Sequence, residues 1–144
     1  MRLAVLALIP LMAAAAPDLT LWSVDPLHKL TPTEAPSPEW NSAGARMACA
    51  RNEWESIQVI VRTSEPVHAL SVNLSELKGP GDSLLPLSRM RLCKVEWVDV
   101  NAPFDPDTPS TDPEWQPDPL PRVNPASDRF DLDPEHNLVF WIMV

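Results

Sequence analysis

Glycine, cysteine and basic residues are all scarce in this sequence of 144 residues. It contains 3 glycines against 18 prolines, so we expect rigid loops rather than flexible ones. Its 2 cysteines, Cys49 and Cys93, have no clustered histidines beside them, which argues against a zinc site. Lys and Arg number 11 against 20 Asp and Glu, and they are scattered, so nucleic-acid or anionic-membrane binding is disfavoured.

The sequence also lacks an apolar run of the roughly 20 residues that a membrane-spanning helix needs. Arg2, the apolar stretch after it and the alanines at 13–16 predict a secretory signal peptide over residues 1–16. Cleavage is expected near Ala15 or Ala16, and a retained membrane anchor is the alternative. Removing Arg2 leaves 10 basic and 20 acidic residues, a net charge near −10. We therefore expect a secreted or periplasmic protein with no membrane contact after cleavage.

Cys49 and Cys93 allow two interpretations. An even cysteine count in an exported chain permits a disulfide. Two small, buried, free thiols are the alternative, because free cysteine packs like an apolar side chain. The sequence leaves this choice open.

Apolar residues make up 44% of the chain, enough for one globular core of ordinary size. The clearest strand covers residues 54–63, where Ile57, Val59 and Val61 alternate onto one face. Trp54 and Ile60 lie on the other face, so both faces should be covered. This pattern predicts a central strand with Trp54 in the core.

Further strand patterns predict an all-β, antiparallel fold. The strands are expected at 19–24 with Trp22 as an anchor, 45–50, 67–74, 89–100 and 136–144, with a turn at 78–82. In the segment 67–74 the alternation places Leu70, Val72 and Leu74 inward.

The polar triplet 51–53 predicts a turn or a bulged crossing, since Asn52 tolerates a positive φ. Arg51 and Glu53 are interpreted as a solvated ion pair or as a clamp toward another domain.

Residues 101–128 form a predicted long loop with eight prolines and five aspartates. Such a loop is usually functional or covers a partner surface. Asp105, Asp107 and Asp112 suggest calcium, but their spacing matches no EF-hand loop, so no metal or other cofactor is expected.

Three residues are candidate contacts to a carbohydrate or to another domain: Trp115, Asp118 and Trp40. Trp115 suits stacking on a sugar ring, and it suits packing against proline rings or a second domain equally well. Trp40, in a loop at 31–42, is expected to cover the core rather than bind sugar.

Residues 136–144 predict a final strand with two apolar faces, and the sequence stops inside it. Chain ends normally lie exposed at the surface. We therefore expect a domain truncated in its last strands, with an unpaired edge that favours self-association.

Four segments together resemble the N-terminal domain of glycoside hydrolase family 123 and of related glycoside-hydrolase-like proteins. The motif residues Arg51, Asn52, Glu53 and Gln58 belong to the first, ARNEWESIQ at 50–58. The others are LWSVDPLHKL at 21–30, QPDPLP at 116–121 and NLVFWIMV at 137–144.

The resemblance implies that residues 17–144 form an antiparallel β-sandwich, immunoglobulin-like or jelly-roll-like and incomplete at its C-terminus. It also implies a C-terminal TIM-barrel partner domain in the same polypeptide, missing from this sequence. That barrel would hydrolyse N-acetylhexosamine-containing glycans with help from the substrate's acetamido group, so no catalytic residue maps onto this chain. The alternatives are a free-standing carbohydrate-binding module, with Trp115 and Trp40 stacking on sugar, and a structural or adhesive exported domain.

Overall fold

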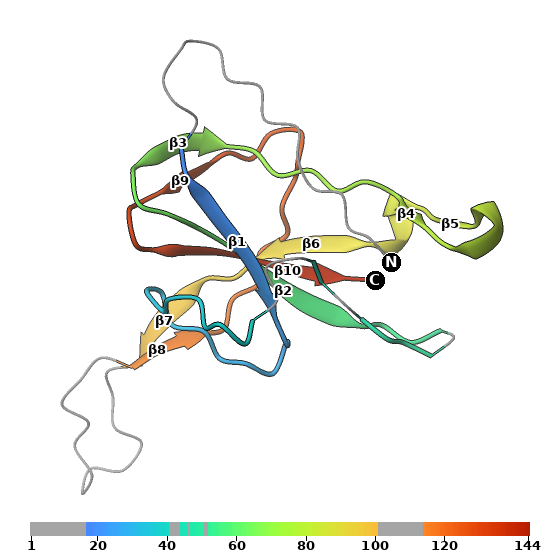
Figure 1. Ribbon diagram of the computed structural model, residues 1–144, viewed down its shortest axis with the longest axis horizontal. Helices are drawn as coiled ribbons and strands as arrows, with labels where there is room; N and C mark the ends of the chain where they lie inside the picture. The colour runs from blue at the N-terminus through green and yellow to red at the C-terminus, as the bar shows by residue number, and fades with distance from the viewer. Residues whose placement is uncertain (1–16, 41–43, 46, 51, 101–113) are drawn as a thin grey trace, which may run out of the picture.

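A computed structural model describes residues 17–40, 44–45, 47–50, 52–100 and 114–144, which form an all-β fold of antiparallel sheets (Figure 1). The elements are β1 (Leu19–Val24), β2 (Ser56–Thr63), β3 (Val67–Leu70), β4 (Leu77–Lys78), η1 (Pro80–Asp82), β5 (Leu84–Leu85), η2 (Leu87–Arg89), β6 (Arg91–Lys94), β7 (Trp97–Val100), β8 (Glu114–Pro117), β9 (Phe130–Leu132) and β10 (Asn137–Met143). The predicted turn at 78–82 is confirmed as the 3-10 turn between β4 and β5.

The main sheet has four strands in the order β1-β2-β10-β6. Its centre is β2, where Ile60 pairs with Trp22 of β1 and with Val139 of β10. β-Branched residues dominate β2, which suits a strand covered on both faces. The prediction of a central strand in this region is confirmed.

β10 also lies inside the sheet, because it pairs with β2 along one edge and with β6 along the other. Beyond it, the Val144 amide donates to the Glu55 carbonyl at 2.9 Å, and the Glu55 amide donates back at 3.0 Å. The expectation of an unpaired edge on this strand is therefore wrong.

Two apolar cores lie on opposite faces of the main sheet, since neighbouring strand residues point to opposite sides. The larger core consists of Ile57, Val61, Val67, Leu77, Met90, Leu92, Leu132, Leu138, Phe140 and Ile142. The tryptophan core consists of Trp22, Val24, Leu30, Ile60, Val95 and Val139, with Trp40, Trp97 and Trp141 packed against it.

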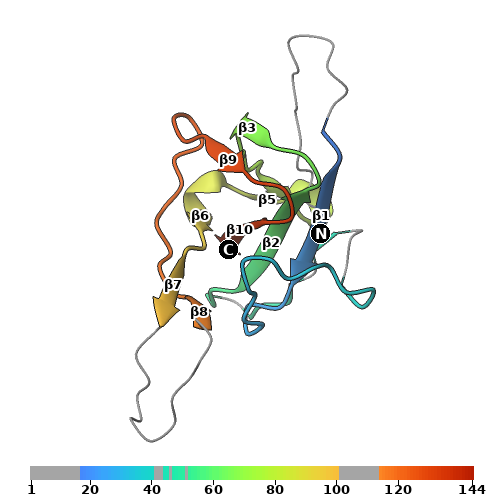
Figure 2. The same cartoon turned by 90° about the vertical axis from the view of Figure 1, so that its left-hand side faces the viewer.

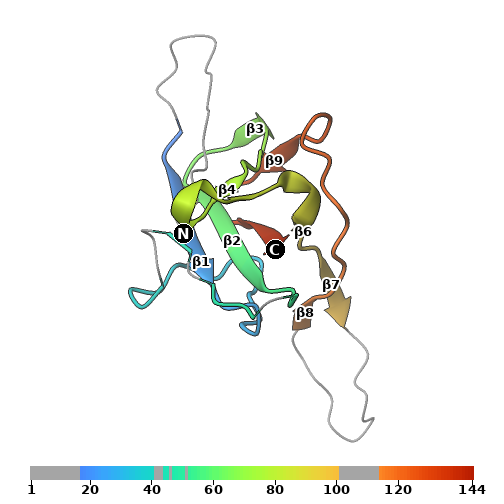
Figure 3. The ribbon, with the colours of Figure 1, turned by 90° about the vertical axis from the view of Figure 1, so that its right-hand side faces the viewer.

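Different parts of the chain cover the two cores. The β3–β9 pair and the β4–β5 hairpin contribute side chains to the larger core. The β7–β8 hairpin and the segment 25–40 lie at the tryptophan core. The β3–β9 pair and the β7–β8 hairpin therefore stand at opposite ends of the molecule in both side views (Figures 2 and 3).

The predicted strand at 89–100 is divided into β6 and β7, and the chain that follows β8 runs beside it. The Lys94 amide donates to Pro121 O at 3.0 Å, and the Asp118 amide donates to Glu96 O at 3.1 Å. These bonds lie along the outer edge of β6 at Lys94 and of the chain just after β6 at Glu96. The predicted loop 101–128 is wrong over 114–117, because β8 forms there and pairs with β7.

Two further predictions from sequence are wrong. The described residues of the segment 45–50 contain no strand. Trp54 lies before β2 rather than in it, and its side chain is 51% exposed, with the Arg91 guanidinium carbon 4.6 Å from its ring centroid. A cation above the ring gives this tryptophan a partner at the surface that does not require burial.

The segment 67–74 is partly as predicted. β3 ends at Leu70, and Ala69 within it has a φ of 56° where the pairing with β9 shifts register. Leu70, Val72 and Leu74 nevertheless pack against the larger core, so the predicted inward alternation is confirmed.

Candidate functional site

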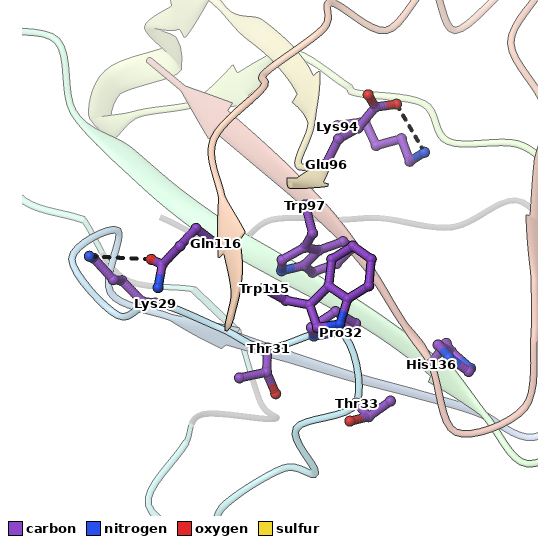
Figure 4. A pocket seen from close by; sticks show the side chains of 10 residues that line it. All are labelled: Lys29, Thr31, Pro32, Thr33, Lys94, Glu96, Trp97, Trp115, Gln116 and His136. Carbon is purple, nitrogen blue, oxygen red and sulfur yellow. Dashed lines mark hydrogen bonds and ion pairs between the residues drawn. The ribbon is translucent and has the colours of Figure 1, made fainter. Parts of the chain in front are cut away.

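An open groove of about 930 Å³ lies beside the β7–β8 hairpin (Figure 4). We call it the hairpin groove. It is lined by Lys29, Thr31, Pro32, Thr33, Lys94, Glu96, Trp97, Trp115, Gln116 and His136. These residues come from four parts of the chain: the segment after β1, the end of β6 with the two residues after it, the hairpin, and the turn before β10.

Two tryptophans form the aromatic part of the groove. Trp97 of β7 pairs with Pro117, and Trp115 of β8 pairs with Asp99 two positions away, so both indoles lie on the same face of the hairpin. Trp97 is half-buried, and its Nε1 donates a hydrogen bond to Leu30 O at 3.0 Å. Trp115 is 46% exposed. One indole is thus anchored, and the other presents an open surface beside it.

Polar groups surround this aromatic pair. Lys29 Nζ lies 3.5 Å from Gln116 Oε1, and Lys94 Nζ lies 3.3 Å from Glu96 Oε1. Figure 4 shows Lys29 and Gln116 across β8 from the indoles, Lys94 and Glu96 above the indoles, and Thr31 and Thr33 below them. An apolar surface with convergent donors and acceptors is the usual composition of a small-molecule site.

The groove wall at 31–33 is fixed by Asn137, which is buried at the start of β10. Its side-chain amide donates to Thr31 O at 3.1 Å and to Glu34 O at 2.9 Å, and its backbone amide donates to Pro32 O at 2.8 Å. Such bonds satisfy carbonyls that a loop packed on a core would otherwise leave unpaired.

Arg62 of β2 completes this support. Its guanidinium donates to Thr33 O at 3.0 Å, to Asn137 Oδ1 at 3.2 Å and to Glu135 Oε2 at 2.6 Å. The Arg62 side chain is only 12% exposed, whereas that of Glu135 is 65% exposed. Sequence reasoning missed Arg62 and the role of Asn137, although a charged residue within an apolar strand was an available signal.

The three residues predicted to contact a carbohydrate or another domain lie in different places in the structure. Trp115 lines the groove. Asp118 is exposed and is not among the lining residues; its backbone amide is bonded to Glu96. Trp40 stacks on Trp22 with ring centroids 6.2 Å apart and an interplanar angle of 8°. The prediction that Trp40 covers the core is confirmed.

The described motif residues act within the fold. Gln58 is buried, and its Nε2 donates to Asp25 O at 3.0 Å and to His28 O at 2.8 Å. Asn52 has a φ of 66°, as the predicted turn requires. Glu53 Oε2 accepts a hydrogen bond of 2.7 Å from the Ala50 amide and so closes that turn.

Several predictions lie outside the described residues: the signal peptide at 1–16, the Arg51 side of the proposed ion pair, and the carboxylates of Asp105, Asp107 and Asp112. Within the described parts of the chain, no group of three His, Cys, Asp or Glu side chains could hold a metal ion. In the same residues, no helix has the length and apolar character needed to cross a membrane.

Both cysteines are free. Cys93 is buried in β6 as the free-thiol interpretation expects, whereas Cys49 is exposed, which that interpretation does not expect.

Among the described lining residues of the groove, Glu96 is the single carboxylate.

No protein-family model matches this chain, and a comparison with curated proteins finds no match.

Proposed function

We propose that this chain is a non-catalytic, glycan-binding β-sandwich domain of an exported glycoside-hydrolase-like protein. The observation that carries the glycan-binding part is the exposed indole of Trp115 beside the anchored indole of Trp97. The carbon face of a sugar ring packs on such a surface, while hydroxyl groups need the donors and acceptors around it. Lys29, Thr31, Thr33 and Gln116 offer those groups.

Two covered faces of the main sheet support the sandwich assignment. The β3–β9 pair and the β4–β5 hairpin lie over one face and share the larger core with it. In a β-sandwich, a second layer of strands covers the inner face of the first in this way. These two short pairs of strands are separate sheets, and we infer that together they form one second layer.

The relation to glycoside hydrolases rests on the resemblance of four sequence segments. On that basis the partner is a C-terminal TIM barrel of the same polypeptide, which acts on N-acetylhexosamine-containing glycans. Glycoside hydrolysis generally uses a pair of carboxyl groups. The described lining of the groove offers Glu96 alone, already in contact with Lys94, and this favours binding over hydrolysis there.

A second candidate function is a contact between this hairpin and the barrel. Exposed apolar side chains on both faces of the hairpin favour it: Trp115 lies on one face, and Val98 and Val100 lie on the other. Exposed apolar side chains that cluster on one element often mark an interaction site.

Glycan binding separates the two candidates. We expect the chain to bind at least one oligosaccharide of a broad panel in calorimetric titration, and Trp115→Ala to weaken that binding about tenfold or more, the equivalent of about 1.4 kcal/mol. Trp54→Ala is the matched control, since Trp54 is equally exposed and lies outside the groove. A panel with no binder would reject the glycan-binding proposal and leave the domain contact. Binding that Trp115→Ala leaves intact would reject the hairpin groove as the glycan site.

A further inference from the structure

We propose that the hairpin groove is selective for acidic glycans, whose sugar residues carry carboxylate or sulfate groups. This inference rests on the proposed glycan binding and adds the chemical class of the ligand. The observation that carries the inference is the position of the lysines. The chain contains only three, and two of them, Lys29 and Lys94, line the groove. The third, Lys78, lies in β4 and is not among the lining residues.

The charge of the groove is opposite to that of the chain. The whole sequence has 20 acidic and 11 basic residues, a formal net charge of −9. The described lining residues include two lysines and one carboxylate, a formal charge of +1. A cationic site on an anionic protein is a local feature, since a random surface of this chain would be negative.

Lys29 carries most of the argument. Its ammonium is exposed and contacts the neutral amide of Gln116 at 3.5 Å, the upper limit for a hydrogen bond. Among the described residues, no carboxylate forms an ion pair with it. A bound anionic group would supply the missing counter-charge through a charge-assisted hydrogen bond.

Lys94 lies on the same side of β8 as the aromatic pair (Figure 4). Its ion pair with Glu96 is 3.3 Å long, and the two side chains are 33% and 47% exposed. Exposed pairs of this kind are weak, so the ammonium can turn to a ligand at little cost. A glycan with one sugar stacked on Trp115 would then have Lys94 on the same side of β8, and a neighbouring sugar of the polymer that passes β8 would reach Lys29.

The net negative charge of the protein opposes this binding, and distance decides the balance. At physiological salt, interactions between exposed charges are screened beyond about 8 Å, so distant carboxylates repel only weakly. The lysines act at contact, where screening is least effective. Binding should therefore be salt-sensitive but favourable.

The test uses pairs of polymers that differ only in charge. Polygalacturonate is compared with its fully methyl-esterified form, and dextran sulfate with dextran, by affinity electrophoresis and calorimetry of the purified chain at low salt. We expect about tenfold tighter binding to the acidic member of at least one pair, and a decline as salt is raised. The first pair reports on carboxylates and the second on sulfates.

Substitutions then assign the preference to the groove. Lys29→Gln combined with Lys94→Gln should remove most of the preference for the acidic polymer, whereas Lys78→Gln, the matched control, should retain it. Trp115→Ala should weaken binding to the acidic polymer as well. Thermal unfolding of each variant checks that the fold is intact.

Three outcomes would overturn the inference. Equal binding to both members of each pair, with Trp115→Ala still harmful, would leave glycan binding standing and reject the acidic class. A preference that the double lysine variant retains would place it elsewhere on the molecule. Binding to none of these polymers, nor to any neutral oligosaccharide, would reject both the acidic class and glycan binding itself.

Discussion

The two faces of β2 stabilise the segments packed on them by different interactions. Toward the larger core this strand presents Ile57, Val59 and Val61, all apolar. Toward the tryptophan core it presents Gln58, Ile60 and Arg62, with polar side chains on both sides of the apolar one. The first face holds its cover by burial of apolar area. The second adds directional hydrogen bonds to the carbonyls of the segment 25–40.

The difference explains where the groove lies. Apolar burial is non-directional, so it stabilises a layer without fixing each atom. Hydrogen bonds from Gln58, Arg62 and Asn137 specify where individual carbonyls sit, and through them the wall at 31–33. A binding site needs its groups held in place by such supporting contacts. The groove accordingly lies on the hydrogen-bonded side of the sheet.

The largest effect should follow from opening the apolar side. Phe140 is 2% exposed and meets Phe130 edge-on with ring centroids 5.3 Å apart. Phe140→Ala should lower the free energy of unfolding by about 3–5 kcal/mol, because it leaves a cavity as well as losing apolar contact. Denaturant midpoints of the two proteins measure this. A loss below about 1 kcal/mol would mean that the larger core is loosely packed.

A smaller and more local effect is expected on the hydrogen-bonded side. Gln58→Leu keeps a similar volume but removes the donors to Asp25 O and His28 O. Asp25 O keeps its hydrogen bond from the His28 amide at 3.1 Å, whereas His28 O loses its Gln58 donor, and this loss should cost about 1–3 kcal/mol. We also expect faster proteolysis within 25–40 relative to the rest of the chain, which limited digestion followed by mass spectrometry detects. Uniform cleavage along the chain would show that the hydrogen bonds of Gln58 do not stabilise the segment 25–40 in particular.

The smallest effect should come from the exposed tryptophan outside both cores. Trp54→Ala removes a ring that contacts the Arg91 guanidinium at the surface, which is worth about 0.5–1 kcal/mol. Its denaturant midpoint should lie close to that of the unchanged protein. A loss as large as that of Phe140→Ala would place Trp54 in the core and restore the interpretation from sequence.

Strands with strong apolar patterns were predictable, and their surroundings were less so. The strand at 19–24 was predicted with the bounds of β1, and the final strand lies within one residue of β10 at each end. A strand that is buried on both faces has apolar residues at most of its positions, and this run is visible in the sequence. The hydrogen bonds of Gln58 and Arg62 were missed because they are accepted by backbone carbonyls of another segment. Every residue has a carbonyl, so such partners leave no signature in the sequence.

The errors have a common physical origin in tertiary context. Trp54 has high β-propensity, yet a neighbouring arginine on β6 provides a surface partner. The segment 114–117 sits among prolines, yet it pairs with a single strand, β7, and proline is tolerated where one side of a strand stays free. Of the groove, the sequence offered Trp115 alone, since Trp97 and the two lysines come together only in the folded chain.

The position of β10 also determines when the molecule can fold. Its residues 137–143 pair with residues 56–62 of β2 and with residues 91–94 of β6, so the sheet has a gap at its centre until they are present. Ribosomes add about 5–20 residues per second, and the β1–β2 pair would wait for several seconds with its apolar surfaces open. Pairing across such sequence separations is also slow in itself. A nascent or partly translated chain should therefore remain sensitive to protease and bind chaperones until residue 143 emerges, and it should then close the sheet in a single late step.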